Sequence, residues 1–179
     1  MNEAGPSSAI SAAVLPEWDQ EIPKTRTCLE RIPAGDLDRG PHPKSMTFRH
    51  LGTHLANIPN WGHLTLLDDH FELEPPGGES TRVEPRASVE AILEWFDTAA
   101  AKARAAIVAA TDEAWHGEWS LKHGGHVLFT LPRVAVFRNM VMNHLIHHRG
   151  QLSVYLRLHD VPVPALYGPS ADEGIPGMP

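Results

Sequence analysis

The chain has 179 residues and a mass of 19.7 kDa, with 42% hydrophobic and 21% charged residues. This size and composition suit one domain with a single core, and they exclude small disulfide scaffolds and disordered chains. Fifteen Lys and Arg against 22 Asp and Glu give a net charge of −7, and basic residues do not cluster, so we expect no nucleic-acid partner.

Two further features bear on location. No apolar run reaches the ~18 residues of a membrane-spanning helix, and Glu3 precedes the first basic residue, unlike a secretory signal. We therefore expect a cytoplasmic protein with no membrane partner. The single cysteine, Cys28, cannot form an internal disulfide and is expected to be buried and inert.

The first half of the chain predicts two helices. Apolar periodicity indicates a helix over residues 8–31, with kinks expected at Pro16 or Pro23. A second helix is expected over residues 45–71, with Ser45 as its N-cap. Both segments have one apolar face, which is typical of helices that pack against a common core.

The second half predicts two more helices and a hairpin. The Ala-rich stretch favours a helix over residues 87–110. The fourth helix is expected over residues 132–159, because proline is favoured in a first helical turn. Between them, alternating apolar residues surround the Gly124–Gly125 pair, which predicts a short β-hairpin.

The chain ends predict no further regular elements. Residues 161–179 contain five prolines and three glycines, so we expect an extended tail. Residues 1–7 are also expected to be extended. The fold class is therefore all-α, an antiparallel four-helix bundle forming one domain over residues 1–179.

Histidine is the unusual residue of this sequence, with 12 copies. At about 100° per residue, His144 and His148 fall within a narrow apolar sector of the fourth predicted helix. His54 falls among apolar residues of the second helix in the same way. A buried imidazole needs a hydrogen-bond partner or a cation, so three that meet would suit a metal ion.

Spacing alone does not decide this interpretation. Chance predicts about 0.8 His pairs four residues apart in a chain of this composition, and two such pairs occur. A core histidine that bonds to a neighbour is the simpler alternative. His50 and His147 also compete as ligands, because each lies within one turn of a proposed one.

Three segments of the sequence resemble one family. The chain is similar to the DinB/YfiT superfamily in the runs NHLIHHRGQLSVYLRLHDVPVPALYGPS, FRHLGTHLANIPNW and LPRVAVFRN. The resemblance covers most of the chain. It implies a four-helix bundle, often a homodimer. By position it also implies that His54, His144 and His148 hold a divalent metal ion.

The resemblance further implies an enzyme that uses a low-molecular-weight thiol, or a hydrolase. We expect a metal-dependent thiol S-transferase or hydrolase that acts on a small electrophilic substrate. Three neutral imidazoles leave an open position on the ion and favour zinc, nickel, cobalt, iron or copper over magnesium or calcium. The rival hypotheses are a non-catalytic metal-binding bundle and a structural bundle in which the histidine cluster is incidental.

Several residues near the proposed ligands are expected to support the site or to form contacts between helices or subunits. Gln151 is expected to orient His144 from the second coordination shell, and Arg149 to form an ion pair or a dimer contact. Met142 and Ile146 are expected to form a second packing surface suited to a dimer. Asn57 and Asn143 are further candidates for a supporting role. Trp61, Trp119 and Phe129 are expected to form the core or the wall of a pocket.

The other histidines are expected to be solvated surface residues. This group comprises His42, His63, His70, His116 and His159. His123 and His126 flank the glycine pair of the predicted hairpin, where they could overhang the site, although surface polar roles are commoner at hairpin tips.

Overall fold

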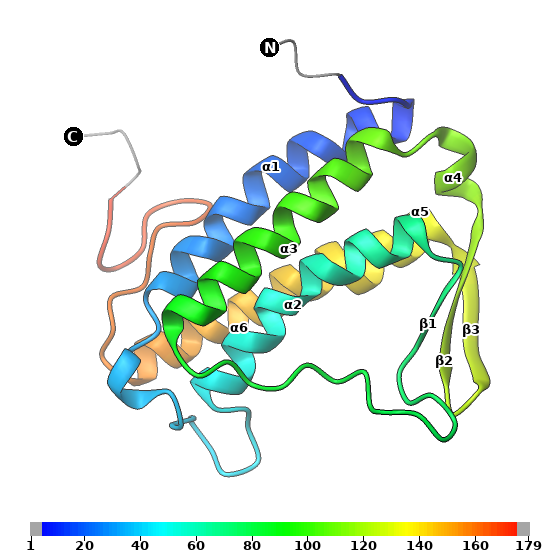
Figure 1. Ribbon diagram of the computed structural model, residues 1–179. Helices are drawn as coiled ribbons and strands as arrows, with labels where there is room; N and C mark the ends of the chain where they lie inside the picture. Colours follow the sequence, from blue (N-terminus) through cyan, green and yellow to red (C-terminus); the bar gives the residue numbers. More distant parts are fainter. Residues whose placement is uncertain (1–4, 175–179) are drawn as a thin grey trace.

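A computed structural model describes residues 5–174, and within them the protein is mainly helical. The long helices are α1 (Ala9–Glu30), α2 (Phe48–Leu67), α3 (Val89–Ala109) and α6 (His144–Leu158). In Figure 1, α1 and α3 run side by side in one layer, and α2 and α6 lie together beneath them. Contacts of α2 with α3 and of α1 with α6 join the two layers.

Shorter helical elements complete this part. A 3₁₀ turn covers Ala34–Asp36, and α4 covers Asp112–His116. The fourth predicted helix is one continuous helical run, but it contains α5 (Arg133–Val136) and a π-helical segment (Phe137–Asn143) before α6. The prediction of regular α-helix over residues 132–159 is therefore wrong for the part immediately before His144.

The helices α1, α2 and α3 begin where a hydroxyl side chain accepts a backbone N–H. Ser8 caps α1 and Ser88 caps α3 in this way. Thr47, rather than the predicted Ser45, caps α2, because its side chain accepts from the backbone N–H of His50. Such caps satisfy a donor that the helix itself leaves unpaired.

A small mixed sheet lies at one end of the helices (Figure 1). Its order is β1 (His70–Glu72), β2 (Glu118–His123), β3 (His126–Pro132), with β1 parallel and β3 antiparallel to β2. The predicted hairpin is present, and Gly124 and Gly125 form its turn with φ values of 59° and 79°, which other residues rarely adopt. The all-α expectation is wrong to the extent of this sheet.

The strand β1 corrects the predicted end of the second helix. That helix stops at Leu67 rather than at residue 71, and Asp68 is already extended. Arg133 donates to the Asp68 carbonyl and to the Asp69 carboxylate, and the Asp69 carbonyl accepts the backbone N–H of Ser120. These contacts with residues far along the chain draw the segment out of the helix.

The main core lies between the helical layers. Its largest fully buried side chains come from the long helices, α4 and the π-helical segment, and include Trp18, Trp115, Phe48, Phe96, Phe137 and Leu55. Cys28 is also fully buried there, and burial raises the pKa of its thiol to about 11. The expectation that Cys28 is buried is confirmed, and the raised pKa agrees with a thiol that stays protonated at neutral pH.

A buried ion pair fastens the tail to the helices. Arg149 on α6 pairs with Glu21 on α1, and the two residues are 1% and 5% exposed. The Tyr167 hydroxyl, from the tail, donates to the Glu21 carboxylate at 2.6 Å. Residues 161–174 contain no regular element, as predicted, and the remainder of the predicted tail and residues 1–4 lie outside the described residues.

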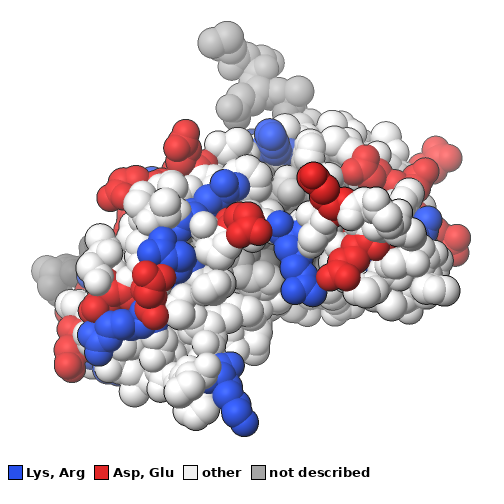
Figure 2. All heavy atoms as spheres, turned by 60° about the horizontal axis from the view of Figure 1, so that its bottom comes forward, with Lys and Arg blue, Asp and Glu red and all other residues white. Residues whose placement is uncertain are grey.

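The described surface is mixed in charge. On the face shown in Figure 2, acidic and basic side chains are interspersed, with uncharged areas between them. Within residues 5–174, none of the helices has both the length and the apolar character needed to cross a bilayer.

Candidate metal centre

Three imidazoles from two helices meet in the lower helical layer. The Nε2 atoms of His54 on α2 and His144 on α6 are 3.1 Å apart, and those of His144 and His148 are 2.7 Å apart. One ligand atom of each ring lies within 4.8 Å of the others, so the cluster can hold a metal ion. The structure thus brings together the three side chains that the sequence singled out.

Hydrogen bonds on the far side of two rings set their tautomers. The Nδ1 of His144 faces the Met140 backbone carbonyl at 3.3 Å, and the Nδ1 of His148 faces the Gln151 Oε1 at 2.7 Å. A carbonyl oxygen only accepts, so both Nδ1 atoms carry the proton and both Nε2 atoms present a lone pair. Two lone pairs therefore face each other inside the cluster, which is unfavourable without a cation between them.

The spacing of the three nitrogens suits a small cation. Zinc–imidazole bonds of about 2.0–2.1 Å in tetrahedral geometry separate two ligand nitrogens by about 3.3 Å. The His54–His144 separation of 3.1 Å is close to this value. The 2.7 Å separation of His144 and His148 is shorter, and relaxing it requires a movement of only a few tenths of an ångström.

Burial keeps the imidazoles neutral. His148 is 8% exposed, and the other two are half-buried. Desolvation, followed by the charges of the other two histidines, lowers the pKa of His54 to about 4. Desolvation is also the main cause that lowers the pKa values of His144 and His148. Neutral imidazole is the form that ligates a metal.

The π-helical segment determines which face of the fourth helical run reaches the cluster. A π turn contains more residues than an α turn, so the faces after Phe137–Asn143 are rotated relative to a regular helix. Met142 consequently lies in the core with 0% exposure, and its predicted place in a dimer surface is wrong. The homodimer itself stays a prediction.

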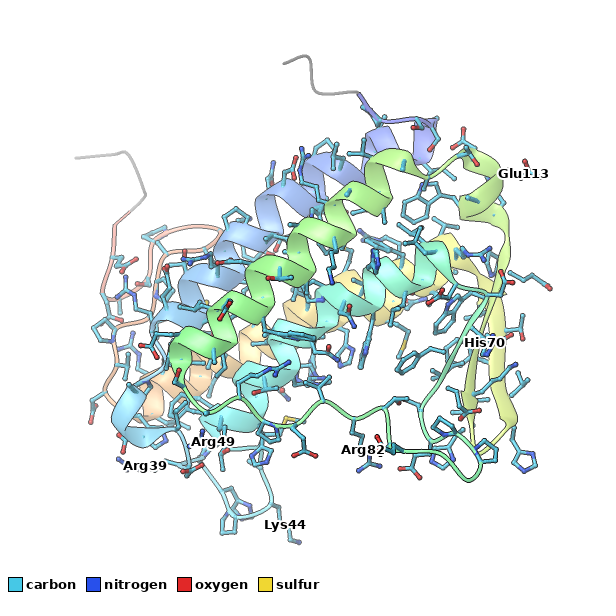
Figure 3. All side chains as sticks on the ribbon, viewed as in Figure 1. Arg39, Lys44, Arg49, His70, Arg82 and Glu113 are labelled. Carbon is cyan, nitrogen blue, oxygen red and sulfur yellow. The ribbon has the colours of Figure 1, made fainter. Side chains whose placement is uncertain are left out.

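A cavity of about 740 Å³ opens beside His54. Its walls come from α2, from β1, from the loop before α2 and from the segment between β1 and α3, with Thr53, Asn57, Trp61, Phe71, Lys44 and Arg82 among the lining residues. Figure 3 shows Lys44 on the loop that precedes α2 and Arg82 on the segment between β1 and α3, both at the lower side of the molecule. The cluster therefore has access to a space that can admit a small molecule.

The two competing ligands lie outside the cluster. His50 is exposed, and its Nδ1 is 2.8 Å from the Thr47 hydroxyl, although the residue lines the cavity. His147 is exposed, and its ring contacts the ring of His148 at a centroid distance of 4.9 Å. The geometry thus favours the predicted three residues over either alternative.

The supporting residues require two adjustments. Gln151 contacts His148, not His144 as predicted, because it lies three residues beyond His148 on the same helix. Arg149 forms an ion pair, which confirms that alternative, but it is buried against α1 rather than on the surface.

The structure supports a role for Asn57 at the site more than the sequence did. It is 8% exposed, it lines the cavity one turn after His54, and its Oδ1 has no hydrogen-bond partner among the described residues. The sequence signal that could have identified Asn57 was the presence of a polar residue on the apolar face of the second predicted helix. Asn143, in contrast, is exposed.

Trp61 and Trp119 occupy wall and core positions, as expected, whereas Phe129 is half-buried on the sheet. Trp61 lines the cavity and contacts the rings of His54 and His144 at centroid distances of 5.6 and 5.4 Å. Trp119 is 5% exposed and packs on Phe129 at 6.3 Å.

The remaining histidines divide into two groups. His42, His70, His116, His123 and His126 are exposed, and neither residue of the hairpin tip lines the cavity. The prediction is wrong for His63 and His159, which are half-buried and each have a ring nitrogen that is buried without a partner among the described residues.

Comparison with known proteins bears directly on this arrangement. The sequence matches the DinB family over residues 8–178. The chain belongs to the DinB family. No curated protein matches it.

Two crystal structures share the DinB fold. A DinB-like protein from Bacillus subtilis is 18% identical, with a TM-score of 0.65 over 85% of this chain and 95% of that one. A DinB-like protein from Bacillus cereus is 22% identical, with a TM-score of 0.61 over 86% of this chain and 95% of that one. At these identities the likeness shows the fold alone.

Proposed function

We propose that this DinB-family protein is a divalent-metal-dependent enzyme that activates a low-molecular-weight thiol or water toward a small electrophile. His54, His144 and His148 would hold the ion, and zinc, nickel, iron or cobalt suit the three nitrogens. We also propose that α1, α2, α3 and the helical run ending in α6 constitute the four-helix bundle that the family resemblance implies.

One observation carries the metal assignment. The Nε2 atoms of His144 and His148 lie 2.7 Å apart, and with both Nδ1 atoms donating to carbonyl oxygens, two Nε2 lone pairs face each other there. A proton does not relieve this arrangement at neutral pH, since burial lowers the pKa values of all three histidines. A cation does.

A bound divalent ion supplies Lewis acidity, which makes a water or thiol ligand a better nucleophile at neutral pH. The residues of this chain have their own tasks. Gln151 holds the proton on the Nδ1 of His148 and orients the ring, and Trp61 covers one side of the cluster. The cavity beside His54 provides space for a substrate, which favours catalysis over metal storage.

The first test measures metal content. Protein purified without an affinity tag should contain a divalent ion at near one equivalent, and His148→Ala should lose it. His50→Ala is the matched control, because His50 lines the same cavity but lies outside the cluster. His148→Asn, a smaller change of shape, guards against misfolding of the alanine variant. Undiminished metal in both His148 variants would contradict the site.

The second test concerns turnover. Metal-loaded protein should consume an electrophile in the presence of one of several thiols, or hydrolyse it, and the His148 variants should not. Stoichiometric metal without turnover over a broad screen would favour the non-catalytic bundle instead.

A further inference from the structure

A second, smaller cavity adjoins the first one. Its volume is about 180 Å³, and no polar atom is exposed to it. The walls are provided by α2, β1, β2 and the helical run that leads to α6, with Leu64, Thr65, Trp119, Leu121, Val136 and Met140 among the lining residues. We refer to this cavity as the apolar compartment.

The apolar compartment lies one aromatic side chain away from the histidine cluster. Trp61, Phe71 and Leu73 line both cavities, so they form a shared wall. The ring of Trp61 also contacts the rings of His54 and His144. A molecule that enters the compartment is therefore close to any group bound at the cluster.

The two cavities differ in chemistry. The larger one presents Thr53, His54 and the buried Asn57, whose Oδ1 has no partner among the described residues, and it has Lys44 and Arg82 at its rim (Figure 3). The apolar compartment exposes no polar atom. Dry apolar cavities of about 150 Å³ accommodate benzene, so this compartment has room for a six-carbon ring or a branched alkyl group.

We propose that the apolar compartment binds the apolar group of the substrate, and that the substrate class is a small electrophile carrying a six-carbon ring or a branched alkyl group beside its polar reactive centre. This inference rests on the proposed function, because it places the reactive centre at the histidine cluster. The sheet acquires a role as well, since β1 contributes to the shared wall through Phe71, and β2 supplies Trp119 and Leu121 to the rest of the lining.

Paired probes test the inference by affinity. On zinc-loaded protein, 4-phenylbutanoate should bind about tenfold or more tightly than butanoate, because burying a ring of this size removes a large apolar area from water. Calorimetry measures the two affinities, and zinc analysis of the same samples measures the occupancy of the cluster. A structural role for the sheet alone predicts no such difference between the probes.

Methionine methyl signals locate the bound ring. In protein labelled with [methyl-¹³C]methionine, 4-phenylbutanoate should shift the Met140 signal, whereas Met142, buried in the core, serves as the internal reference. Leu121→Trp should fill the compartment and abolish both the Met140 shift and the preference for the phenyl probe. Leu128→Trp is the matched control, because Leu128 lies on the neighbouring strand and is 56% exposed.

Each outcome has a distinct meaning. A preference that is lost in Leu121→Trp and kept in Leu128→Trp supports the compartment, and Leu64→Phe provides a milder obstruction should the tryptophan variant fail to fold. Equal affinities for the two probes, or an unmoved Met140 signal, on zinc-loaded protein would overturn this inference and leave the proposed function standing. Absence of bound zinc would overturn the proposed function, and the substrate assignment with it.

Discussion

Acidification should destabilise the metal-free protein through the buried histidine cluster. The pKa of His54 falls from 6.5 to about 4 on folding, with burial as the main cause. Above pH 6.5 both the folded and the unfolded states hold this ring neutral, so it contributes its full stability there. Below pH 6.5 the unfolded chain binds a proton that the folded state does not, and the free energy of unfolding falls.

The magnitude follows from the width of that pH window. Each pH unit costs about 1.4 kcal/mol, so His54 alone should lower the free energy of unfolding by about 3 kcal/mol between pH 7 and pH 4. The loss should level off below about pH 4, where the folded state also takes up the proton.

Urea unfolding of chelator-treated protein, followed by circular dichroism between pH 7.5 and pH 4, measures the effect. Carboxylates such as Glu21 also lose stabilising contacts in acid, so the useful quantity is the difference between the wild type and His54→Gln. That difference should shift against the wild type by about 3 kcal/mol as the pH falls. A difference that stays constant within about 1 kcal/mol across this range would refute the assignment of His54 as a buried neutral base.

Three further predictions concern single residues. Gln151→Leu removes the acceptor that orients a cluster imidazole at 2.7 Å, and zinc affinity in competition titrations should fall about 10- to 100-fold, while an unchanged affinity would exclude this role. Glu21→Gln leaves the buried Arg149 without its counter-charge, and the free energy of unfolding in urea should drop by about 3–5 kcal/mol, so a loss below about 1 kcal/mol would contradict the ion pair. Gly52→Ala would place a methyl carbon 2.8 Å from a core isoleucine methyl and should cost about 1–3 kcal/mol, whereas Gly150→Ala meets nothing within 4 Å and should not destabilise the protein; equal thermal melts for these two variants would refute the packing argument.

The sequence alone determined the helices and the residues of the cluster. Apolar periodicity places the ends of the first and third predicted helices within two residues of α1 and α3, because each helix has one face that must be buried. The same periodicity places His54, His144 and His148 on apolar faces. The Gly124–Gly125 turn was also readable, because its positive φ values favour glycine.

Tertiary structure decided the features that depend on distant residues. The strand β1 forms because β2, about 50 residues away in the sequence, provides its backbone hydrogen-bond partners. A local sequence pattern does not reveal partners at that distance. The burial of Met142 follows from a π-helical segment, whose register a projection at 100° per residue does not anticipate. Gln151 also contacts His148 rather than His144, its predicted partner.

The cavities are the clearest case of this division. Both are bounded by α2 and β1, which follow one another in the chain, but the other walls come from segments as far apart as Lys44, Arg82, Leu121 and Met140. Apolar periodicity indicates which face of a single helix or strand is buried. Volume and lining chemistry arise only when several elements pack together, so the metal-ligating residues were visible in the sequence, whereas the space that would hold a substrate became visible only in the folded chain.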